Sequence, residues 1–369
     1  MQKVKLGDVL LYEQPTKYIV ESDRYNNDFE IPVLTAGKSF LLGYTDEKTG
    51  IFNDLPVIIF DDFTTAIKFV DFPFKVKSSA MKILKPNKEK ADIRYLYYKM
   101  LTIKTDSDQH KRYWISKFAN IQISLPPLPT QKAIAAKLDK AQEIISYNKQ
   151  LIEKYNQLTQ SLFIDMFGDP VRNEKGWEIV KLKELGKFKN GLNYAKSESG
   201  ISLKVIGVGD FKNYSIINDV KKIPEIQMND FPKTDFFLKD EDLLFVRSNG
   251  NKDLVGRCLI VYVGDETVSY SGFCIRFRNE SEILNTNYLV QLLQKSEFKK
   301  HIFKNGRGAN IQNINQELLN DIEIQIPPIS QQNQFVERIE KIDAQKQMAL
   351  ESLAKSEALF QSLLQESFK

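Results

Sequence analysis

The chain has 369 residues, which is long for a single domain, and its 42% hydrophobic content is sufficient for folded cores. Lys and Arg number 52 and Asp and Glu 48, so the formal charge is only +4, and a nucleic-acid surface would need local clusters of cations. The 2 cysteines, without CxxC spacing, and the 2 histidines exclude a conventional zinc site. We expect a reduced, cytoplasmic chain without membrane association, because the opening residues contain neither a secretory leader nor a long apolar run.

Residues 1–128 are predicted to form a β-rich domain. One helix is expected within residues 91–101, because the apolar residues there recur on one helical face. Short β segments separated by turn residues occupy residues 31–45, 55–63, 66–77 and 78–84.

A change of period marks the end of this domain. Ile121 and Ile123 alternate with polar residues as in a half-buried strand, and Pro126 and Pro127 then end the strand. From Thr130, which the pattern predicts as a helix cap, apolar residues recur with the period of a coiled coil. We therefore expect one long helix over residues 129–169.

Residues 170–329 are predicted to repeat this plan after a linker-like segment at 168–176. A helix is expected at residues 285–294, and a second long helix follows at residues 330–369, with Ser330 as its predicted cap. The strands of this second domain are predicted within residues 203–211, 242–250, 257–265 and 270–277.

The two halves align directly. Residues 121–169 align with residues 322–369 without a gap, and this places Pro126 on Pro327 and Gln131 on Gln332. The domain openings also match, because Val4, Lys5 and Leu6 correspond to Val180, Lys181 and Leu182. The sequence therefore predicts two related domains that start and end alike but differ inside.

Each long helix carries an apolar stripe that it cannot bury alone, so we expect the two helices to pair with each other. Antiparallel pairing is favoured, because the two outer ends then hold separate domains. Polar seam residues such as Asn148 and Ser356 weaken this core and fix its register. The residues predicted to pair the helices are Ile134, Leu138, Ile145, Ile152, Tyr155, Leu162, Phe335, Ile339, Ile342, Leu353, Phe360 and Leu363.

Catalytic motifs are not found. Residues 35–39 read TAGKS, but a P-loop needs a glycine where this chain has Pro32. Both Pro-Pro pairs are followed by aliphatic residues, whereas an amino-methyltransferase needs an aromatic residue there. Asp61 and Asp62 are adjacent on a predicted strand, so their side chains point to opposite faces and cannot readily share a metal. We expect a chain that catalyses nothing by itself.

Basic and amide-bearing loops occur in both domains and are the expected DNA contacts. Lysines on phosphates would position the protein, and Arg, Asn, Gln and Thr side chains would read bases. The alternative for any single lysine is a solvated surface. The candidate DNA-binding residues are Thr35, Lys38, Thr64, Thr65, Lys68, Lys75, Lys77, Ser78, Lys111, Arg112, Tyr113, Arg247, Asn249, Asn251, Lys252, Tyr270, Ser271, Arg276, Lys304, Arg307, Asn310 and Gln312.

Both halves of the chain have the same order of features: a VKL opening, a variable β-rich domain, a Tyr-Leu helix, a Pro-Pro-x-x-x-Gln switch and a long helix. This doubled order resembles the specificity subunits of type I restriction-modification systems. The resemblance covers essentially the whole chain. It implies an α+β fold in which two β-rich target recognition domains are separated by two long helices that form an antiparallel coiled coil, with an internal pseudo-twofold repeat. One departure is that Leu128–Thr130 replaces the acidic residues that commonly precede the glutamine.

The resemblance also implies a function. The chain would be a non-catalytic reader of a split, asymmetric site in double-stranded DNA, one half per domain. It would dock two adenine methyltransferase subunits, which bring S-adenosylmethionine, and restriction subunits, which bring ATP and Mg²⁺. A helix of about 35 residues is roughly 50 Å long, so a spacer of several unread base pairs is expected.

Two other readings stay open at this stage. The chain could be a stand-alone DNA-binding or scaffold protein that uses its coiled coil for self-association, or an enzyme with an unrecognised active site. The first needs no methyltransferase partner, and the second requires catalysis by this chain alone.

Overall fold

The computed structural model describes residues 2–35, 39–103, 113–195, 197–212, 216–251, 254–295, 297–300 and 313–369. The chain divides into two compact units. Unit 1 comprises Met1–Leu151 and Ala349–Lys369, and unit 2 comprises Ile152–Met348. Each unit therefore contains one of the two domains together with a part of each long helix.

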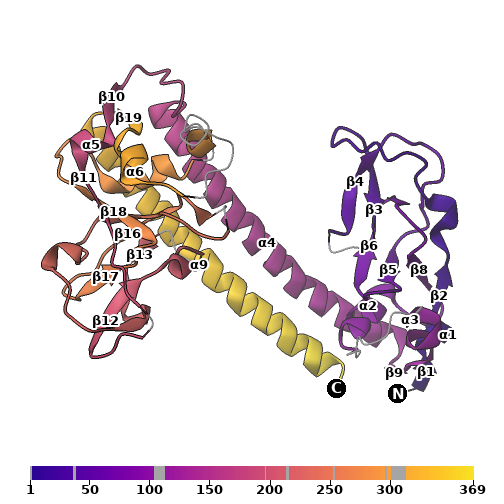
Figure 1. The fold of residues 1–369 in the computed structure, drawn as a ribbon. Helices are drawn as coiled ribbons and strands as arrows, with labels where there is room; N and C mark the ends of the chain where they lie inside the picture. The colour runs from indigo at the N-terminus through magenta and orange to yellow at the C-terminus, as the bar shows by residue number, and fades with distance from the viewer. Residues whose placement is uncertain are drawn as a thin grey trace. The chain divides into compact units, whose positions relative to one another are not determined.

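The described residues of unit 1 form three sheets (Figure 1). Strand β1 (Gln2–Lys5) pairs antiparallel with β9 (Gln122–Leu125). The four-stranded sheet has the order β2 (Leu10–Glu13), β8 (Met81–Pro86), β5 (Val57–Asp61), β6 (Ile67–Val70), and the three-stranded sheet has the order β4 (Leu41–Thr45), β3 (Ile31–Leu34), β7 (Lys75–Val76). The helical segments are α1 (Leu6–Val9), η1 (Pro15–Tyr18), α2 (Ile93–Leu101), α3 (Tyr113–Ser116) and η2 (Phe118–Asn120).

Unit 2 repeats this arrangement. Strand β10 (Glu178–Lys181) pairs with β19 (Glu323–Ile326). The five-stranded sheet has the order β11 (Gly186–Asn190), β18 (Cys274–Asn279), β15 (Asp242–Val246), β16 (Cys258–Val261), β13 (Ile216–Ile217), and the three-stranded sheet has the order β14 (Glu225–Met228), β12 (Ile201–Ile206), β17 (Val268–Tyr270). The helical segments are α5 (Leu182–Leu185), η3 (Val208–Lys212), η4 (Val220–Lys222), η5 (Thr234–Phe236), α6 (Thr286–Leu293) and α8 (Gln316–Asn320).

The predicted internal repeat is confirmed by the pairing registers. Lys5 pairs with Gln122 in unit 1, and Lys181 pairs with Glu323 in unit 2. In each three-stranded sheet the middle strand has one antiparallel and one parallel neighbour. The two domains are thus built on one topology, and unit 2 adds β13 at the edge of its larger sheet.

The central strand of each larger sheet is buried on both faces, which explains its unbroken apolar sequence. In β5, Ile58 and Phe60 face a core that includes residues of α2, while Val57 and Ile59 face a second core. Strand β15 divides its residues in the same way between two cores. Each domain therefore has a core on both sides of its sheet.

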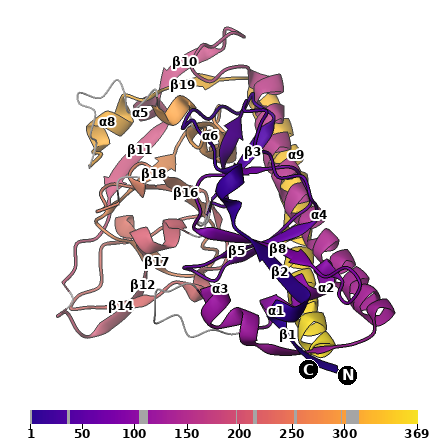
Figure 2. The same cartoon turned by 90° about the vertical axis from the view of Figure 1, so that its right-hand side faces the viewer.

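The long helices are α4 (Leu128–Phe167) and α9 (Ile329–Ser367). In unit 1 the early part of α4 lies near the end of α9, because Tyr98 of α2 donates to Asp139 at 2.6 Å and lies 6.0 Å from the Phe360 ring. In unit 2 the end of α4 meets the start of α9, where the rings of Phe163 and Phe335 lie 5.6 Å apart. The segments therefore pair antiparallel, as predicted (Figures 1 and 2).

The predicted caps Thr130 and Ser330 are wrong, because α4 already begins at Leu128 and α9 at Ile329. The backbone N–H of Gln131 donates to the carbonyl of Pro127 at 3.1 Å, so the first turn of α4 begins at the proline pair. Proline suits this place, since its missing N–H and fixed φ cost nothing there.

The residues predicted to pair the helices are all buried or half-buried. Leu138, Ile145 and Phe360 belong to one cluster in unit 1. At the end of α4 the fully buried residues are Phe163 and Phe167, one position after the predicted seam. The reason is that this end packs into the core of the second domain, on Tyr288 as well as on α9.

Candidate nucleic-acid interface

Three chain segments meet at the end of β15 in unit 2. The backbone N–H of Arg247 donates to the carbonyl of Phe273 at 2.8 Å, and the N–H of Ile314 donates to the carbonyl of Arg247 at 2.8 Å. An isolated antiparallel bridge joins Ser248 and Asn313. We call this meeting point the loop junction. It joins the segment after β15 to the turn between β17 and β18, which the sequence predicted as part of one strand at residues 270–277.

The same junction occurs in unit 1. The N–H of Asp62 donates to the carbonyl of Ala80 at 3.3 Å, and the N–H of Tyr113 donates to the carbonyl of Asp62 at 3.4 Å. Asp62 directly follows β5, as Arg247 directly follows β15. The scaffold of the junction is therefore common to both domains, and its side chains are free to differ.

Asp62 and Arg247, the central residues of the two junctions, differ in charge and in burial. The Asp62 carboxylate is buried, lies 3.3 Å from Lys82 Nζ, and accepts a hydrogen bond from the Trp114 N–H at 2.8 Å. Asp62 therefore stabilises the fold. Arg247 is half-exposed, and its guanidinium is the kind of group that can form a fork on guanine or phosphate.

Each junction also exposes a phenylalanine. Phe63 is 55% exposed beside Asp62, and Phe273 is 61% exposed beside Arg247. Sequence reasoning missed both residues, because an aromatic residue in a turn is not by itself a signal. Exposed aromatic rings among polar loops suit contacts with thymine methyl groups or base faces.

Several of the candidate DNA-binding residues remain accessible. Asn249 accepts a hydrogen bond from the Asn251 N–H at 2.7 Å, which fixes the loop after β15. Thr64 donates to Asp61 in the turn after β5, and Lys68 Nζ lies 5.9 Å from the Phe40 ring centroid. The accessible candidates are exposed or half-buried: Thr35, Thr64, Thr65, Lys68, Lys77, Ser78, Arg247, Asn249 and Asn251.

Other candidates are corrected, because they are buried in the fold. Lys75 is 2% exposed, forms an ion pair with Glu47 at 2.9 Å and donates to the Thr49 carbonyl at 2.6 Å. Lys77 is half-exposed but forms an ion pair with Asp23, so its charge is partly neutralised. The candidates that are buried, with at most 6% of their surface exposed, are Lys75, Tyr113, Tyr270, Ser271 and Arg276.

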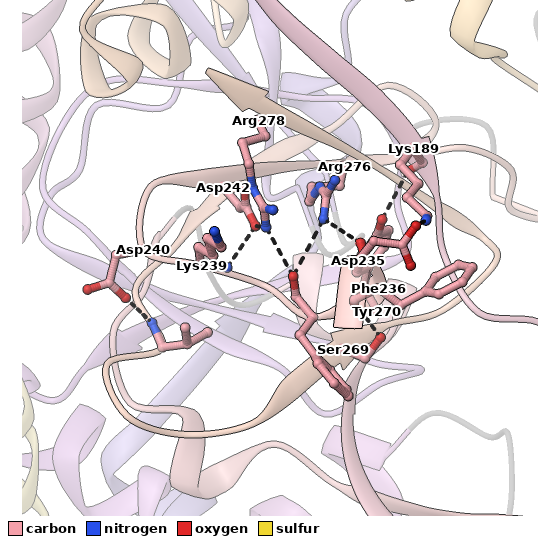
Figure 3. Close-up of polar contacts among 12 residues, drawn as sticks. Lys189, Asp235, Phe236, Lys239, Asp240, Asp242, Ser269, Tyr270, Arg276 and Arg278 are labelled. Carbon is pink, nitrogen blue, oxygen red and sulfur yellow. Dashed lines mark hydrogen bonds and ion pairs between the residues drawn. The ribbon is translucent and has the colours of Figure 1, made fainter. Parts of the chain in front are cut away.

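Arg276 belongs to a network that ties the segment around η5 to the larger sheet (Figure 3). Its Nη1 donates to the carbonyl of Asp235 at 2.9 Å. On the same strand, Arg278 donates to both oxygens of the buried Asp242 carboxylate, from Nε at 2.8 Å and from Nη2 at 2.6 Å. Its Nη2 also donates to the Phe237 carbonyl at 3.0 Å. The pKa of Arg278 is raised by its hydrogen bond to Asp242. These contacts tie both arginines to the domain, where they hold the segment around η5 and the buried Asp242 in place.

The remaining candidates lie outside the described residues, so the structure does not place them. They are Lys38, Lys111, Arg112, Lys252, Lys304, Arg307, Asn310 and Gln312. Within the described part of the chain, no group of three or more His, Cys, Asp or Glu residues could hold a metal ion. No helix in that part is long and apolar enough to cross a membrane.

The family model for the type I restriction modification DNA specificity domain matches residues 1–157 and 174–359. The chain therefore belongs to the family of type I restriction-modification specificity subunits. Over 210 residues it is 39% identical to the EcoR124I/EcoR124II specificity subunit of Escherichia coli, covering 52% of this chain and 50% of that protein. The chain thus spans about half the length of that relative. It is also 26% identical to the MjaVIII specificity subunit of Methanocaldococcus jannaschii, covering 92% of this chain and 85% of that protein.

Solved structures agree with the fold. The S subunit of a type I restriction-modification system from M. genitalium is 14% identical, superposes with a TM-score of 0.62, and covers 100% of this chain and 96% of that one. A chain from a study of complex assembly and conformational transition of the type I R-M system gives a TM-score of 0.55 at 18% identity, covering 100% and 97%. These likenesses support the α+β fold with two repeated domains and two long helices.

Proposed function

We propose that this chain is the DNA-reading subunit of a type I restriction-modification complex and recognises a split, asymmetric site, one half per domain. Partner methyltransferase subunits would methylate adenine at N6, and restriction subunits would cut. The chemistry would belong to those partners, with S-adenosylmethionine, ATP and Mg²⁺ bound there and not by this chain. Two methyltransferase copies fit a chain that presents two similar domains.

The observation that carries this proposal is the repeated loop junction. Corresponding backbone hydrogen bonds at Asp62 and Arg247 join the same chain segments in both domains, while the side chains there differ. Base readout needs a rigid backbone that presents variable Arg, Asn and Thr side chains. A shared scaffold with different side chains is what two different half-sites require.

The test is genome-wide mapping of N6-methyladenine in a host that expresses the chain with the methyltransferase of its own system. A host with the methyltransferase alone is the control. A split motif that appears only with this chain supports the proposal and reveals both half-sites and the spacer. If an assembled, active methyltransferase produces no new motif, the proposal fails and a stand-alone DNA-binding protein becomes the better description.

A further inference from the structure

Arg247 and Phe273 form the last cross-strand pair between β15 and β18. The register pairs Val246 with Cys274, and the ladder continues by one pair because the Arg247 N–H donates to the Phe273 carbonyl at 2.8 Å. Opposite residues in such a pair have Cα atoms about 5.5 Å apart and side chains on one face of the sheet. Val246 and Cys274 belong to the core on one face, so alternation directs the next pair to the other face. The guanidinium and the phenyl ring therefore start from neighbouring points.

A tight turn holds Phe273 in place. The Cys274 N–H donates to the Ser271 carbonyl at 2.8 Å and closes the turn, and the Phe273 N–H donates to Ser271 Oγ at 3.3 Å. Ser271 is itself buried, and its N–H donates to the Ile206 carbonyl at 2.9 Å. The Phe273 residue is 61% exposed on this turn. Ser271, which the sequence predicted as a DNA contact, instead supports the turn that presents the Phe273 ring.

The backbone of Arg247 is fixed on both edges. Its N–H donates to Phe273, and its carbonyl accepts the Ile314 N–H at 2.8 Å. Arg247 is nevertheless half-exposed, so the side chain reaches solvent from an ordered backbone. A group held in this way loses less conformational freedom on binding than the same group in a flexible loop.

Unit 1 has a different pair at the same point. There the Asp62 N–H donates to the Ala80 carbonyl at 3.3 Å, so Asp62 and Ala80 correspond to Arg247 and Phe273. Asp62 is buried, and the side chain of Ala80 is a single methyl group. The scaffold therefore folds without a cation and a ring at this point, and the combination of the two belongs to unit 2.

The chemistry of the pair identifies its ligand within DNA. A guanidinium forks onto O6 and N7 of guanine, and an apolar side chain contacts the 5-methyl group of thymine. A backbone phosphate offers hydrogen-bond acceptors but no methyl group beside them. Adjacent bases are about 3.4 Å apart along each strand, which suits two side chains whose Cα atoms are about 5.5 Å apart.

We propose that Arg247 and Phe273 together read one thymine–guanine step in the major groove. Phe273 covers the thymine 5-methyl group, and Arg247 donates to O6 and N7 of the adjacent guanine. This inference rests on the proposed function and names two neighbouring bases of the half-site that unit 2 reads.

The first experiment removes the methyl group alone. Each thymine of the mapped motif is replaced in turn by deoxyuridine, and binding of the assembled chain and methyltransferase is measured by fluorescence anisotropy. One replacement should weaken wild-type binding about fourfold, the factor that corresponds to burying one methyl group. The same replacement should not affect Phe273→Ala, because that variant has already lost the contact. Phe273→Leu should retain part of the effect.

A matched control removes another exposed apolar side chain of unit 2. Ile179 is 54% exposed on β10, away from the loop junction, so Ile179→Ala should respond to deoxyuridine as wild type does. Urea unfolding of Phe273→Ala should match wild type, because the ring is exposed and the hydrogen bond to Arg247 uses the backbone carbonyl.

The second experiment removes one acceptor from guanine. Replacing the guanine next to the sensitive thymine by 7-deazaguanine, which lacks N7, should weaken wild-type binding about tenfold. Arg247→Ala should be indifferent to this replacement. The two sensitive bases must be neighbours, since the two residues are neighbours across the sheet.

Three results would overturn the inference. The first is a mapped motif without adjacent thymine and guanine. The second is a deoxyuridine scan in which wild type and Phe273→Ala respond alike at every position. The third is that Phe273→Ala weakens binding equally for all sequences, which would make Phe273 a contact without base preference. Failure of the proposed function is distinguishable, because wild type would then direct no methylation at any split motif.

Discussion

The side-chain oxygen of Gln131 accepts a hydrogen bond from the backbone N–H of Asp92 at 2.9 Å. The Gln131 amide nitrogen donates to the carbonyls of Pro126 at 2.8 Å and Lys90 at 3.1 Å, and the side chain is 0% exposed. Asp92 is the N-cap of α2, so one buried amide joins the start of α4 to the start of α2. This arrangement explains the glutamine that follows the first proline pair.

Gln332 repeats the arrangement in unit 2. It accepts from the Asn285 N–H at 2.8 Å and donates to the carbonyls of Pro327 at 2.7 Å and Ile283 at 2.9 Å. Asn285 caps α6, as Asp92 caps α2. The Pro-Pro-x-x-x-Gln motif is therefore a structural joint between each long helix and its domain.

Replacing this amide should destabilise each unit. Gln131→Leu removes the side-chain partner of one N–H and two carbonyls, of which the Pro126 carbonyl contact is fully buried, so we expect a loss of about 1–3 kcal/mol in the free energy of unfolding. Gln332→Leu should behave alike. Urea unfolding measures the change, and Lys132→Leu at the exposed neighbouring position is the control. Equal stability of Gln131→Leu and Lys132→Leu would contradict the role of the joint.

The sequence predicts the repeated fold well, because strand alternation, the proline pair and the helical period are local signals. It does not predict what Gln131 does, since the partners of its side chain at the start of α2, Asp92 and Lys90, lie 39 and 41 positions away. The shift from the predicted seam to Phe163 and Phe167 has a similar cause, because α4 there packs on a domain core.

The candidate site shows the same limit. The sequence around a lysine or arginine in a strand is the same whether its side chain faces DNA or a neighbouring carboxylate. Only the fold shows that Lys75 forms an ion pair with Glu47 and that Arg276 donates to a carbonyl of η5. Arg247 and Asp62 occupy equivalent positions, but their equivalence depends on hydrogen bonds across the sheet and not on sequence similarity.

Charge in the helix seam should disrupt unit 1. Ile145 is 4% exposed and shares a cluster with Phe360, so Ile145→Asp buries a carboxylate without a partner and should cost more than about 3 kcal/mol. Assembly with the methyltransferase should be lost as well. Urea unfolding and size-exclusion chromatography measure both effects. Ser146→Asp, at the exposed adjacent position, should change neither, and a full complex with Ile145→Asp would count against the paired helices.

Arg247→Ala should relax one half-site only. A guanidinium that forks onto a base contributes about 1–3 kcal/mol of discrimination, so recognition at one position should weaken by roughly tenfold to a hundredfold. Methylation mapping with the variant chain measures this. Asp62→Asn is the matched change at the other junction, and it should lower stability without altering either motif. Equal weakening of both half-sites by Arg247→Ala would show that Arg247 does not read bases.

Arg278 should matter for stability and not for DNA contact. Arg278→Leu removes both contacts to the Asp242 carboxylate, whose side chain is 1% exposed, so we expect a loss of about 3–5 kcal/mol. The double variant Arg278→Leu with Asp242→Leu should recover much of this loss, because no charge is then left buried. Urea unfolding of the three proteins forms a double-mutant cycle. A simple sum of the single effects would mean that the two residues do not interact.

Lys295 should give unit 2 a stability that rises with pH. Its Nζ lies 4.6 Å from the Phe163 ring centroid, and burial lowers its pKa to about 8 from 10.5, with Glu297 acting in the opposite direction. The unfolded chain therefore binds more protons than the folded chain between these two values, and stability increases with pH across that window. Asp343 and Lys346 line the same cavity of about 530 Å³. Burial raises the pKa of the Asp343 carboxyl above its usual 3.8, so its deprotonation lowers stability. That loss begins at a lower pH than the gain from Lys295.

The test compares urea midpoints at pH 7 and pH 9.5. Wild type and the control Lys300→Met, exposed in the same segment, should show the increase, because both keep Lys295. Lys295→Met keeps the apolar stem on Phe163 without a charge, so it should be more stable than wild type at pH 7 and should lack the increase. The same pH dependence in Lys295→Met and wild type would assign the effect to another group.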